Sequence, residues 1–282
     1  MRLLLWLLRA MSPGARRRLA GGVAALAWAL RIRRAVALDN VTRAFPELDA
    51  TAQRGIARAA YDSMALAALE SVTSDLVTGD GLEQVVRVPH WNGLDEVLRA
   101  KQPVLMVSAH LGSWELLVEV MARRGVPLSA VVRPLRGSFN RAVVKSRLDA
   151  GVELIYQRGA LQGMLAALQR GRAVVQLIDQ ALPGPEAVWV PFFGRLASTT
   201  PAVSLVALRT GAPVFVVTAV RDGEGLRMDV EGPVPLPETG SRAEKVAAHT
   251  AQLTALLEAR VRKDPGQWLW LHRRWKGTPP RG

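Results

Sequence analysis

The sequence predicts an α/β fold in which a mostly parallel central sheet is wrapped by helices. From residue 84 onward, short apolar runs typical of buried strands alternate with segments whose apolar residues recur at helical spacing. This alternation is typical of parallel sheets, because a helix returns the chain between successive strands. A chain of 282 residues is also long enough to bury the core of one large domain with helical additions.

The N-terminal segment carries eight arginines and no acidic residue before Asp39. Its apolar runs, residues 3–8 and 19–30, are each shorter than the about 20 residues that span a bilayer. We expect two short amphipathic helices that lie in an anionic leaflet, with Trp6 and Trp28 at the interface. The alternatives are a helical hairpin packed on the domain and a cleaved signal peptide. The predicted parts are residues 1–38, which associate with the membrane, and residues 39–282, a single α/β domain.

The elements that follow are predicted from spacing and from turn residues. Residues 39–48 predict a short helix and a turn that ends at proline, and residues 51–77 predict a long helix on which Glu70 is interpreted as a solvated residue. A role for Glu70 in a site is the less favoured alternative. Strands are expected at residues 85–88, 104–107, 128–132, 153–156, 173–178, 213–220 and 226–230, and helices at 94–100, 115–124, 138–150, 159–170, 201–209 and 241–263. The last strand alternates as a hairpin partner would, and Ser241 with Glu244 forms a capping box.

The segment at residues 102–117 has the pattern of a buried strand followed by a tight turn and a helix. The turn carries His110, Ser113 is the expected N-cap, and Glu115 falls in the first helical turn. In this geometry the carboxylate of Glu115 can fold back onto the imidazole of His110. The two residues would then form a general base and the acid that orients it. The alternative is a histidine that closes a turn and a glutamate that suits a helix N-terminus.

Further polar residues follow predicted strand ends. His110, Arg133, Arg158 and Asp179 all lie just past the carboxyl ends of strands, where open α/β sheets gather their ligands. Arg133 precedes a proline that keeps its backbone extended, and its guanidinium suits a phosphate or an oxyanion. Asp179 is interpreted as a buried acid paired with Arg or His, and a turn residue is the alternative.

Composition narrows the chemistry. The chain has no cysteine, so disulfides and thiolate catalysis are excluded, and its four histidines show no zinc-binding spacing, so no metal is expected. A net charge of +13 indicates an anionic partner. The C-terminal stretch at residues 264–276 mixes tryptophan with basic residues, which suits nucleic acid, a membrane interface, a basic rim beside the site, or tryptophan packing of the last helix onto the sheet. No nucleic-acid-binding signature supports the first of these.

The aromatic stretch at residues 187–200 has two interpretations. It contains Phe192 and Phe193 and is broken by Pro191 and Gly194. Such a stretch lines an apolar channel or forms a core strand with its turn, and composition alone favours the core.

Seven stretches taken in order resemble the bacterial lipid A biosynthesis acyltransferases, the late lauroyl and myristoyl enzymes, together with the actinobacterial relatives that acylate phosphatidylinositol mannosides. They are N-V-T-R-A-F-P-E-L (40–48), S-A-H-L-G-S-W-E (108–115), V-V-R-P (131–134), D-Q (179–180), V-P-F-F-G-R-L-A (190–197), R-T-G-A-P-V (209–214) and Q-W-L-W-L-H-R-R-W-K (267–276). The resemblance runs nearly end to end. The sequence departs from it in an N-terminal apolar segment broken by arginine, and in A-L-P-G-P-E after D-Q, where relatives are often richer in glycine.

The resemblance implies a glycerolipid-acyltransferase-like fold and an enzyme on the cytoplasmic face of the inner membrane. It implies an acyl thioester donor, acyl carrier protein or coenzyme A, and no cofactor. It also implies His110 as base and Glu115 as its partner. The expected acceptor is a hydroxyl of a lipid A precursor; another membrane lipid (an aminolipid, a phosphatidylinositol mannoside or a polyene lipid) is the alternative. The candidate substrate-binding residues are Arg133, Arg158, Asp179, Gln180, Phe192 and Phe193.

In the expected mechanism the hydroxyl attacks the thioester directly, because the chain has neither a cysteine nor a G-x-S-x-G elbow. Arg133 and backbone amides near Ser113 are expected to stabilise the oxyanion, and Phe192 and Phe193 are expected to wall the acyl tunnel. The competing classes are a non-catalytic lipid-surface or carrier-binding protein, a nucleic-acid-binding protein, and a hydrolase that uses the same histidine.

Overall fold

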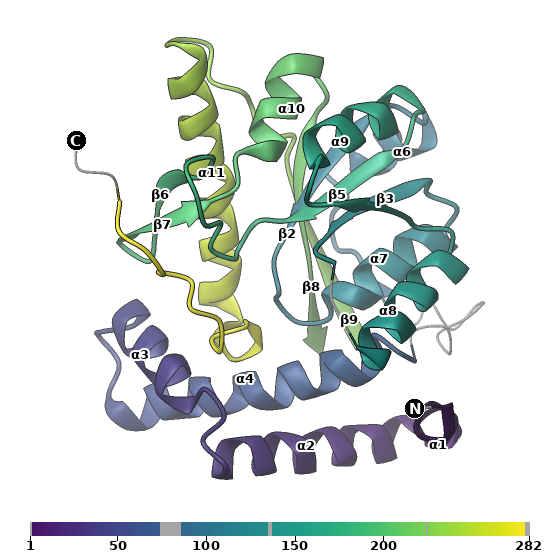
Figure 1. Cartoon of the computed structure of the whole chain (residues 1–282), viewed down its shortest axis with the longest axis vertical. Helices are drawn as coiled ribbons and strands as arrows, with labels where there is room; N and C mark the ends of the chain where they lie inside the picture. Colours follow the sequence, from purple (N-terminus) through teal and green to yellow (C-terminus); the bar gives the residue numbers. More distant parts are fainter. Residues whose placement is uncertain (1, 74–85, 135–136, 224, 280–282) are drawn as a thin grey trace.

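The fold was determined as a computed structural model, which describes residues 2–73, 86–134, 137–223 and 225–279 (Figure 1). The predicted α/β class is confirmed. The central sheet has seven strands in the order β1-β9-β8-β2-β5-β3-β4. Its strands are β1 (Val86–Arg87), β2 (Val104–Ser108), β3 (Leu128–Val132), β4 (Glu153–Tyr156), β5 (Ala173–Leu177), β8 (Val214–Asp222) and β9 (Gly225–Glu231).

Five neighbouring strands, β8, β2, β5, β3 and β4, run parallel, while β9 and β1 run in the opposite direction. Every residue of β2 is buried, as expected for a central parallel strand covered on both faces. Strand β9 alternates between buried and half-buried residues and pairs antiparallel with β8, so the hairpin prediction is confirmed. The carboxyl ends of the five parallel strands therefore meet at one edge of the sheet.

Helices cover both faces of this sheet. One face packs against α9 (Ala160–Gln169), α10 (Ala202–Thr210) and α11 (Arg242–Lys263), and the other against α6 (Leu94–Arg99) and α7 (Trp114–Arg123). The capping box of Ser241 and Glu244 at the start of α11 is confirmed. Helix α8 (Ser138–Asp149) contacts β4 and has no buried residue, so it is a surface helix.

The N-terminal region forms α1 (Arg2–Ala10), α2 (Pro13–Ala29), α3 (Arg34–Ala44) and α4 (Ala50–Glu70). Helix α2 runs alongside α4 below the sheet (Figure 1). Trp28 is half-buried and packs edge-on against Tyr61 of α4, with ring centroids 5.2 Å apart, and its expected place at a membrane interface stays a prediction. The long helix ends at Glu70, and the predicted residues 74–77 and the predicted start of the first strand at residue 85 lie outside the described residues.

The exposed apolar side chains of this region form a definite stripe. Leu19, Val23, Leu26 and Leu30 are exposed and recur at helical spacing on α2, while Ala20 and Ala24, on its other side, are buried. Trp6 is also exposed. Among the described residues, none of the helices combines the length and the hydropathy that crossing a bilayer requires.

The aromatic stretch forms the hairpin β6 (Val188–Phe192) and β7 (Arg195–Thr199). The rings of Phe192 and Phe193 pack in one cluster, the aromatic cluster, whose other members are Phe45, Trp268, Trp270 and Trp275. The packing interpretation of the C-terminal tryptophans is therefore confirmed. The cluster holds the C-terminal chain against the hairpin and next to the end of β2.

Candidate active site

His110 lies in the turn after β2, and its ring is held by Asp179, which follows β5. Nδ1 of His110 is 2.8 Å from Oδ1 of Asp179, and the backbone N–H of His110 donates to Oδ2 at 2.8 Å. The indole N–H of Trp268 also donates to Oδ2, at 2.8 Å. Strands β2 and β5 are parallel neighbours, which is why residues 69 positions apart meet at the same edge. The interpretation of Asp179 as a buried acid paired with histidine is confirmed.

The environment of Asp179 keeps it ionised. Burial opposes the charge and by itself would raise its pKa, but the charge of His110 and the hydrogen bonds from His110 and Trp268 outweigh it, so the pKa is below the usual value. The side chain of Asp179 is only 1% exposed, whereas that of His110 is 23% exposed. The pair thus places an anchored carboxylate behind an imidazole that solvent can reach, which is the arrangement of a general base and its orienting acid.

The expected contact between Glu115 and His110 is wrong. Glu115 instead accepts from the guanidinium of Arg147 on α8, at 3.0 Å from Nε and 2.5 Å from a terminal nitrogen. The indole N–H of Trp114 also donates to it, at 3.0 Å. The reason is geometric: α7 begins at Trp114, and Glu115 then faces α8, while the end of β5 lies beside the turn. Glu115 reaches the histidine only through Trp114, whose ring centroid lies 5.1 Å from that of His110.

Gln180 lies against the ring of His110. Its Nε2 is 3.2 Å from one ring nitrogen and 3.4 Å from the other. An in-plane hydrogen bond to Nε2 would lie much farther from Nδ1, so these nearly equal distances place the amide over the face of the ring. The in-plane lone pair of Nε2 is consequently directed away from both Asp179 and Gln180.

The two predicted arginines lie at the same edge of the sheet but farther along it. Arg133 follows β3 and Arg158 follows β4, and the ends of these strands pair at Val132 and Tyr156. Both arginines are exposed, and within the described part of the chain neither forms an ion pair. The structure therefore brings His110, Asp179 and Gln180 into contact and leaves Arg133 and Arg158 on the flank. Phe192 and Phe193 are 1% and 4% exposed in the aromatic cluster, which agrees with the core alternative; their lining of an acyl tunnel stays a prediction.

A polar network that the sequence does not reveal supports the turn. Glu70, at the end of α4, accepts from the hydroxyl of Ser113 and from Arg221 at 2.5 Å. Its interpretation as a solvated residue is wrong. Ser113 does occupy the N-cap position of α7, as expected, but its side chain makes no cap hydrogen bond. Arg221 and Gln267 exchange two hydrogen bonds, at 2.9 and 3.0 Å. These partners are far apart in sequence, so no local pattern signals them.

Two backbone N–H groups of the turn are already hydrogen-bonded within the protein. The N–H of Gly112 donates to the carbonyl of Gln267 at 2.9 Å, and the N–H of Ser113 donates to the carbonyl of Ala219 at 2.8 Å. The amide proton of Ser113 is therefore already donated, and the use of the other backbone amides at the start of α7 for an oxyanion stays a prediction. Guanidinium and amide side chains at this edge are further candidates for that function.

Gly112 allows this turn to approach β8. Its φ is +61°, and a Cβ added there would lie 2.2 Å from the Ala219 carbonyl oxygen. We predict that Gly112→Ala lowers the free energy of unfolding by at least about 3 kcal/mol, because the strand or the turn must move. Urea denaturation measures this effect. Gly125→Ala is the matched control, with a φ of +79° and nothing within 4 Å, and a similar loss there would contradict the argument.

His272 and Arg274 lie behind the pair. Arg274 is fully buried; it donates to the Ser198 carbonyl and the Thr199 hydroxyl, both at 2.6 Å, and burial lowers its pKa to about 10. His272 has a buried Nδ1 without a hydrogen-bond partner. Burial lowers the pKa of His272 from 6.5 to about 4, while Asp179 opposes this shift and nearby positive charges add to it. His272 is therefore neutral near pH 7.

The pKa of His272 predicts a pH dependence of stability. Because the folded-state value is the lower one, the unfolded chain binds more protons between about pH 6.5 and pH 4, and stability falls as pH falls through this window. The loss is at most about 1.4 kcal/mol per pH unit, and less because the ring is partly exposed. Urea denaturation of wild type and His272→Gln at pH 7 and pH 5 tests this. The variant should lose less stability on acidification, and equal losses would contradict the prediction.

The sequence model described as bacterial lipid A biosynthesis acyltransferase matches residues 2–277. The chain belongs to this family. The family transfers acyl groups, so the site has to receive an acyl donor and a lipid acceptor.

Three relatives place the chain within this acyltransferase family. It is 28% identical to a lipid A biosynthesis palmitoleoyltransferase of Escherichia coli over 260 residues, which cover 89% of this chain and 81% of the relative. It is 25% identical to the lipid A biosynthesis lauroyltransferase of the same organism over 283 residues, covering 98% and 90%. A phosphatidylinositol mannoside acyltransferase of Mycolicibacterium smegmatis is 24% identical over 197 residues, covering 68% and 62%.

Proposed function

We propose that this acyltransferase moves a fatty acyl chain from an acyl thioester, carried by acyl carrier protein or coenzyme A, to a hydroxyl of a membrane glycolipid, a lipid A precursor. The single observation that carries this proposal is the His110–Asp179 pair at the carboxyl edge of the sheet, with Nδ1 and Oδ1 2.8 Å apart. The names of the two Escherichia coli relatives support the lipid A acceptor. The mannoside acyltransferase relative favours a second candidate, a glycosylated phospholipid acceptor.

The reaction uses His110 as the base. Asp179 accepts the Nδ1 proton, so Nε2 keeps its lone pair and removes the proton from the acceptor hydroxyl. The alkoxide attacks the thioester carbonyl, the carbon–sulfur bond breaks, and the thiolate takes the proton from the imidazolium. Direct transfer is supported by the absence of cysteine from the sequence. Base catalysis of this kind contributes about 10²- to 10⁴-fold in rate.

The other candidate residues have distinct proposed functions. Glu115 holds Arg147 and also accepts from Trp114, whose ring lies against His110, and the guanidinium of Arg147 is suited to an oxyanion or a phosphate. Arg133 and Arg158 bind phosphate on the donor or the acceptor, since both are exposed at the same edge of the sheet. Gln180 positions the acceptor hydroxyl beside Nε2, and Phe192 and Phe193 support the wall of the acyl tunnel.

We also propose that the enzyme acts on the cytoplasmic face of the inner membrane and that α1 and α2 rest on the anionic leaflet. Trp6 and Leu26 are 63% and 61% exposed, and the surrounding segment is rich in arginine. Apolar side chains next to cations are the composition of an interfacial helix. Residues 1–38 thus serve as the membrane contact of a catalytic domain that begins near residue 39.

The membrane contact gives a prediction. The double variant Trp6→Ala/Leu26→Ala should bind vesicles that contain anionic lipid at least about tenfold more weakly, because each side chain contributes roughly 1.5–3 kcal/mol when fully buried. Vesicle co-sedimentation measures this. The control is Leu148→Ala/Leu196→Ala, which removes exposed apolar side chains elsewhere on the surface. Equal binding by both double variants and wild type would refute this membrane contact.

The acceptor is tested in cells. Mass spectrometry of lipids from a deletion strain should show one lipid A species that lacks a single acyl chain, and complementation with wild type should restore it. Loss of a chain from a phosphatidylinositol mannoside, an aminolipid or a polyene lipid would replace the lipid A acceptor with that lipid. An unchanged lipid profile would favour a non-catalytic lipid-surface protein.

A further inference from the structure

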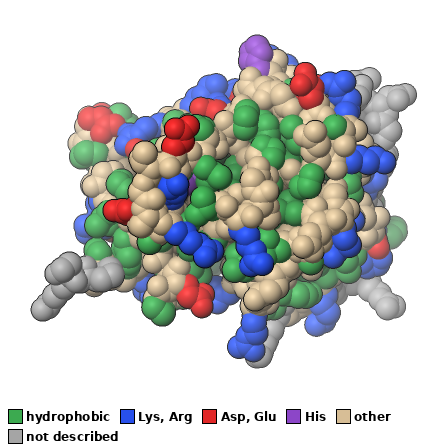
Figure 2. Space-filling model, turned by 90° about the horizontal axis from the view of Figure 1, so that it is seen from above, with side chains coloured by type: hydrophobic (Ala, Val, Ile, Leu, Met, Phe, Trp, Pro, Cys, Tyr) green, Lys and Arg blue, Asp and Glu red, His purple; other side chains and the backbone are tan. Residues whose placement is uncertain are grey.

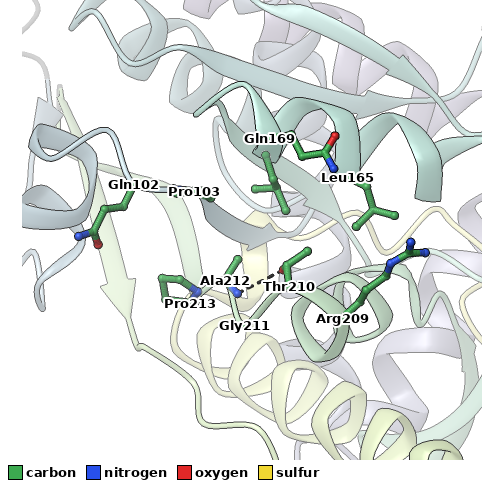
Figure 3. Close-up of a pocket in the computed structure, with 10 residues that line it drawn as sticks. Gln102, Pro103, Leu165, Gln169, Arg209, Thr210, Gly211, Ala212 and Pro213 are labelled. Carbon is green, nitrogen blue, oxygen red and sulfur yellow. Dashed lines mark hydrogen bonds between the residues drawn. The ribbon is translucent and has the colours of Figure 1, made fainter.

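Two adjoining cavities lie at the end of the sheet opposite His110. The first, of about 470 Å³, opens between α9 and α10 above the starts of β2 and β8 (Figure 3). The second, of about 510 Å³, lies between the end of α10 and the start of α11. Arg209 lines both. Because the first cavity is at the amino end of β2, whose carboxyl end carries His110, the two adjoining cavities are separate from the proposed acyl-transfer site.

The second cavity is cationic. Its charged lining residues are Arg209, Arg242 and Lys245, and no aspartate or glutamate of the described part of the chain lines either cavity. Within the described ranges none of these three cations forms an ion pair or a hydrogen bond through its side chain. The nearest acid along the chain, Glu244, accepts from the backbone N–H of Ser241 at 2.7 Å in the capping box.

The position of two of these cations is unfavourable for the fold itself. Arg242 and Lys245 lie in the first turns of the 22-residue helix α11, whose amino end carries positive dipole charge, so they repel it. In the capping box the Ser241 hydroxyl already accepts from the backbone N–H of Glu244. The positive charge offered to a ligand therefore comes from the side chains of Arg242 and Lys245. Cations at a helix amino end that no carboxylate compensates are the kind of locally unfavourable placement that is typical of binding sites.

The first cavity supplies apolar surface. Its lining residues include Leu165, Leu168, Pro103 and Pro213, together with the polar Gln102 and Gln169. The Thr210 hydroxyl donates to the Val206 carbonyl at 2.8 Å. Figure 2, which views the molecule from above, shows hydrophobic side chains gathered in the middle of this face with lysines and arginines around them. Leucine and proline side chains thus line the first cavity, Arg242 and Lys245 line the second, and Arg209 is shared by both.

We infer that the two cavities together bind an amphiphilic anion, with its charged head in the second cavity and its alkyl body in the first. Their volumes are within the range of small-molecule sites, about 300–1,000 Å³. A fatty carboxylate and an alkyl phosphate share this chemistry. The site goes beyond the proposed function and does not depend on it, because no residue of the acyl-transfer site lines either cavity.

Isothermal titration calorimetry with octyl phosphate below its micellar concentration tests the site. Wild type should bind, and Arg242→Ala/Lys245→Ala should bind at least tenfold more weakly while folding as well as wild type, because it removes charges that helix α11 does not favour. The matched control Lys263→Ala, at the other end of the same helix, should bind as wild type does. Leu26→Glu, which alters the exposed stripe of α2, should also leave binding unchanged.

The probes separate the sources of the ligand. Octanoate that binds more tightly than octyl phosphate assigns the site to a fatty carboxylate, and the reverse order assigns it to a phosphorylated lipid. Octyl glucoside, which lacks charge, should not bind. Inorganic phosphate that binds as tightly as octyl phosphate, or octyl phosphate that binds the double variant as tightly as wild type, would overturn the inference. Acyl transfer by the double variant should stay at the wild-type rate, so this outcome and a failure of the proposed function are distinguishable.

Discussion

Replacing His110 with alanine is expected to lower the rate of acyl transfer at least about a hundredfold, because the acceptor hydroxyl loses the base that removes its proton. The fold should survive. The hydrogen bonds that hold the turn involve the backbone N–H groups of residues 110, 112 and 113 and the hydroxyl of Ser113, not the imidazole. The imidazole itself contacts Asp179, Gln180 and Trp114 among the interactions described for it.

The measurement is transfer of a radiolabelled acyl chain from thioester to lipid acceptor by purified protein, with thermal melting as the control for folding. Wild-type activity in a folded His110→Ala variant would remove His110 from the chemistry. The loss should appear in kcat with any acceptor that binds, because the variant removes a proton acceptor rather than a binding contact.

The Asp179→Asn variant is expected to lose about 10²- to 10⁴-fold in rate although it changes no volume. Oδ2 of Asp179 accepts from the His110 backbone N–H and from Trp268, so the new amide oxygen has to take that position. The amide nitrogen then faces Nδ1 of His110 and donates to it. The imidazole consequently carries its proton on Nε2, and the base is in the wrong tautomer.

Glu115→Gln is the matched comparison for this experiment. It leaves an acceptor for Trp114 and Arg147 and does not touch the histidine, so the loss should be smaller than for Asp179→Asn. Steady-state rates of both variants across pH 5 to 9 measure the difference. The opposite order, with Asp179→Asn near wild type and Glu115→Gln inactive, would mean that Glu115 orients the base in the working enzyme.

The sheet could be predicted from the sequence because its central strands are buried on both faces and therefore appear as continuous apolar runs, such as residues 104–107. The ends of those runs also identified His110 and Asp179 as members of one edge. Strand order could not be predicted in the same way. Which of two acids meets His110 depends on β5 lying next to β2, and this is a property of the topology rather than of the spacing between His110 and Glu115.

Contacts between distant segments account for the remaining differences. Glu70 looks like a surface residue of a helix until the end of α4 is placed beside Ser113 and Arg221. The contact of Trp28 with Tyr61 likewise appears only once α2 is packed on α4. The exposed stripe of α2 was predictable because it depends only on helical period, whereas the supporting network of the site depends on which elements meet.

The most direct test of acyl transfer is a stoichiometric assay with purified enzyme, labelled acyl thioester and a hydroxylated lipid A precursor. Direct transfer from the thioester to the hydroxyl predicts that one thiol is released for each ester formed on the acceptor. It also predicts that no label is retained on the protein and that no reaction occurs when the acceptor is omitted. Release of free fatty acid at the same rate without acceptor would contradict it, because His110 would then activate water and the enzyme would be a hydrolase.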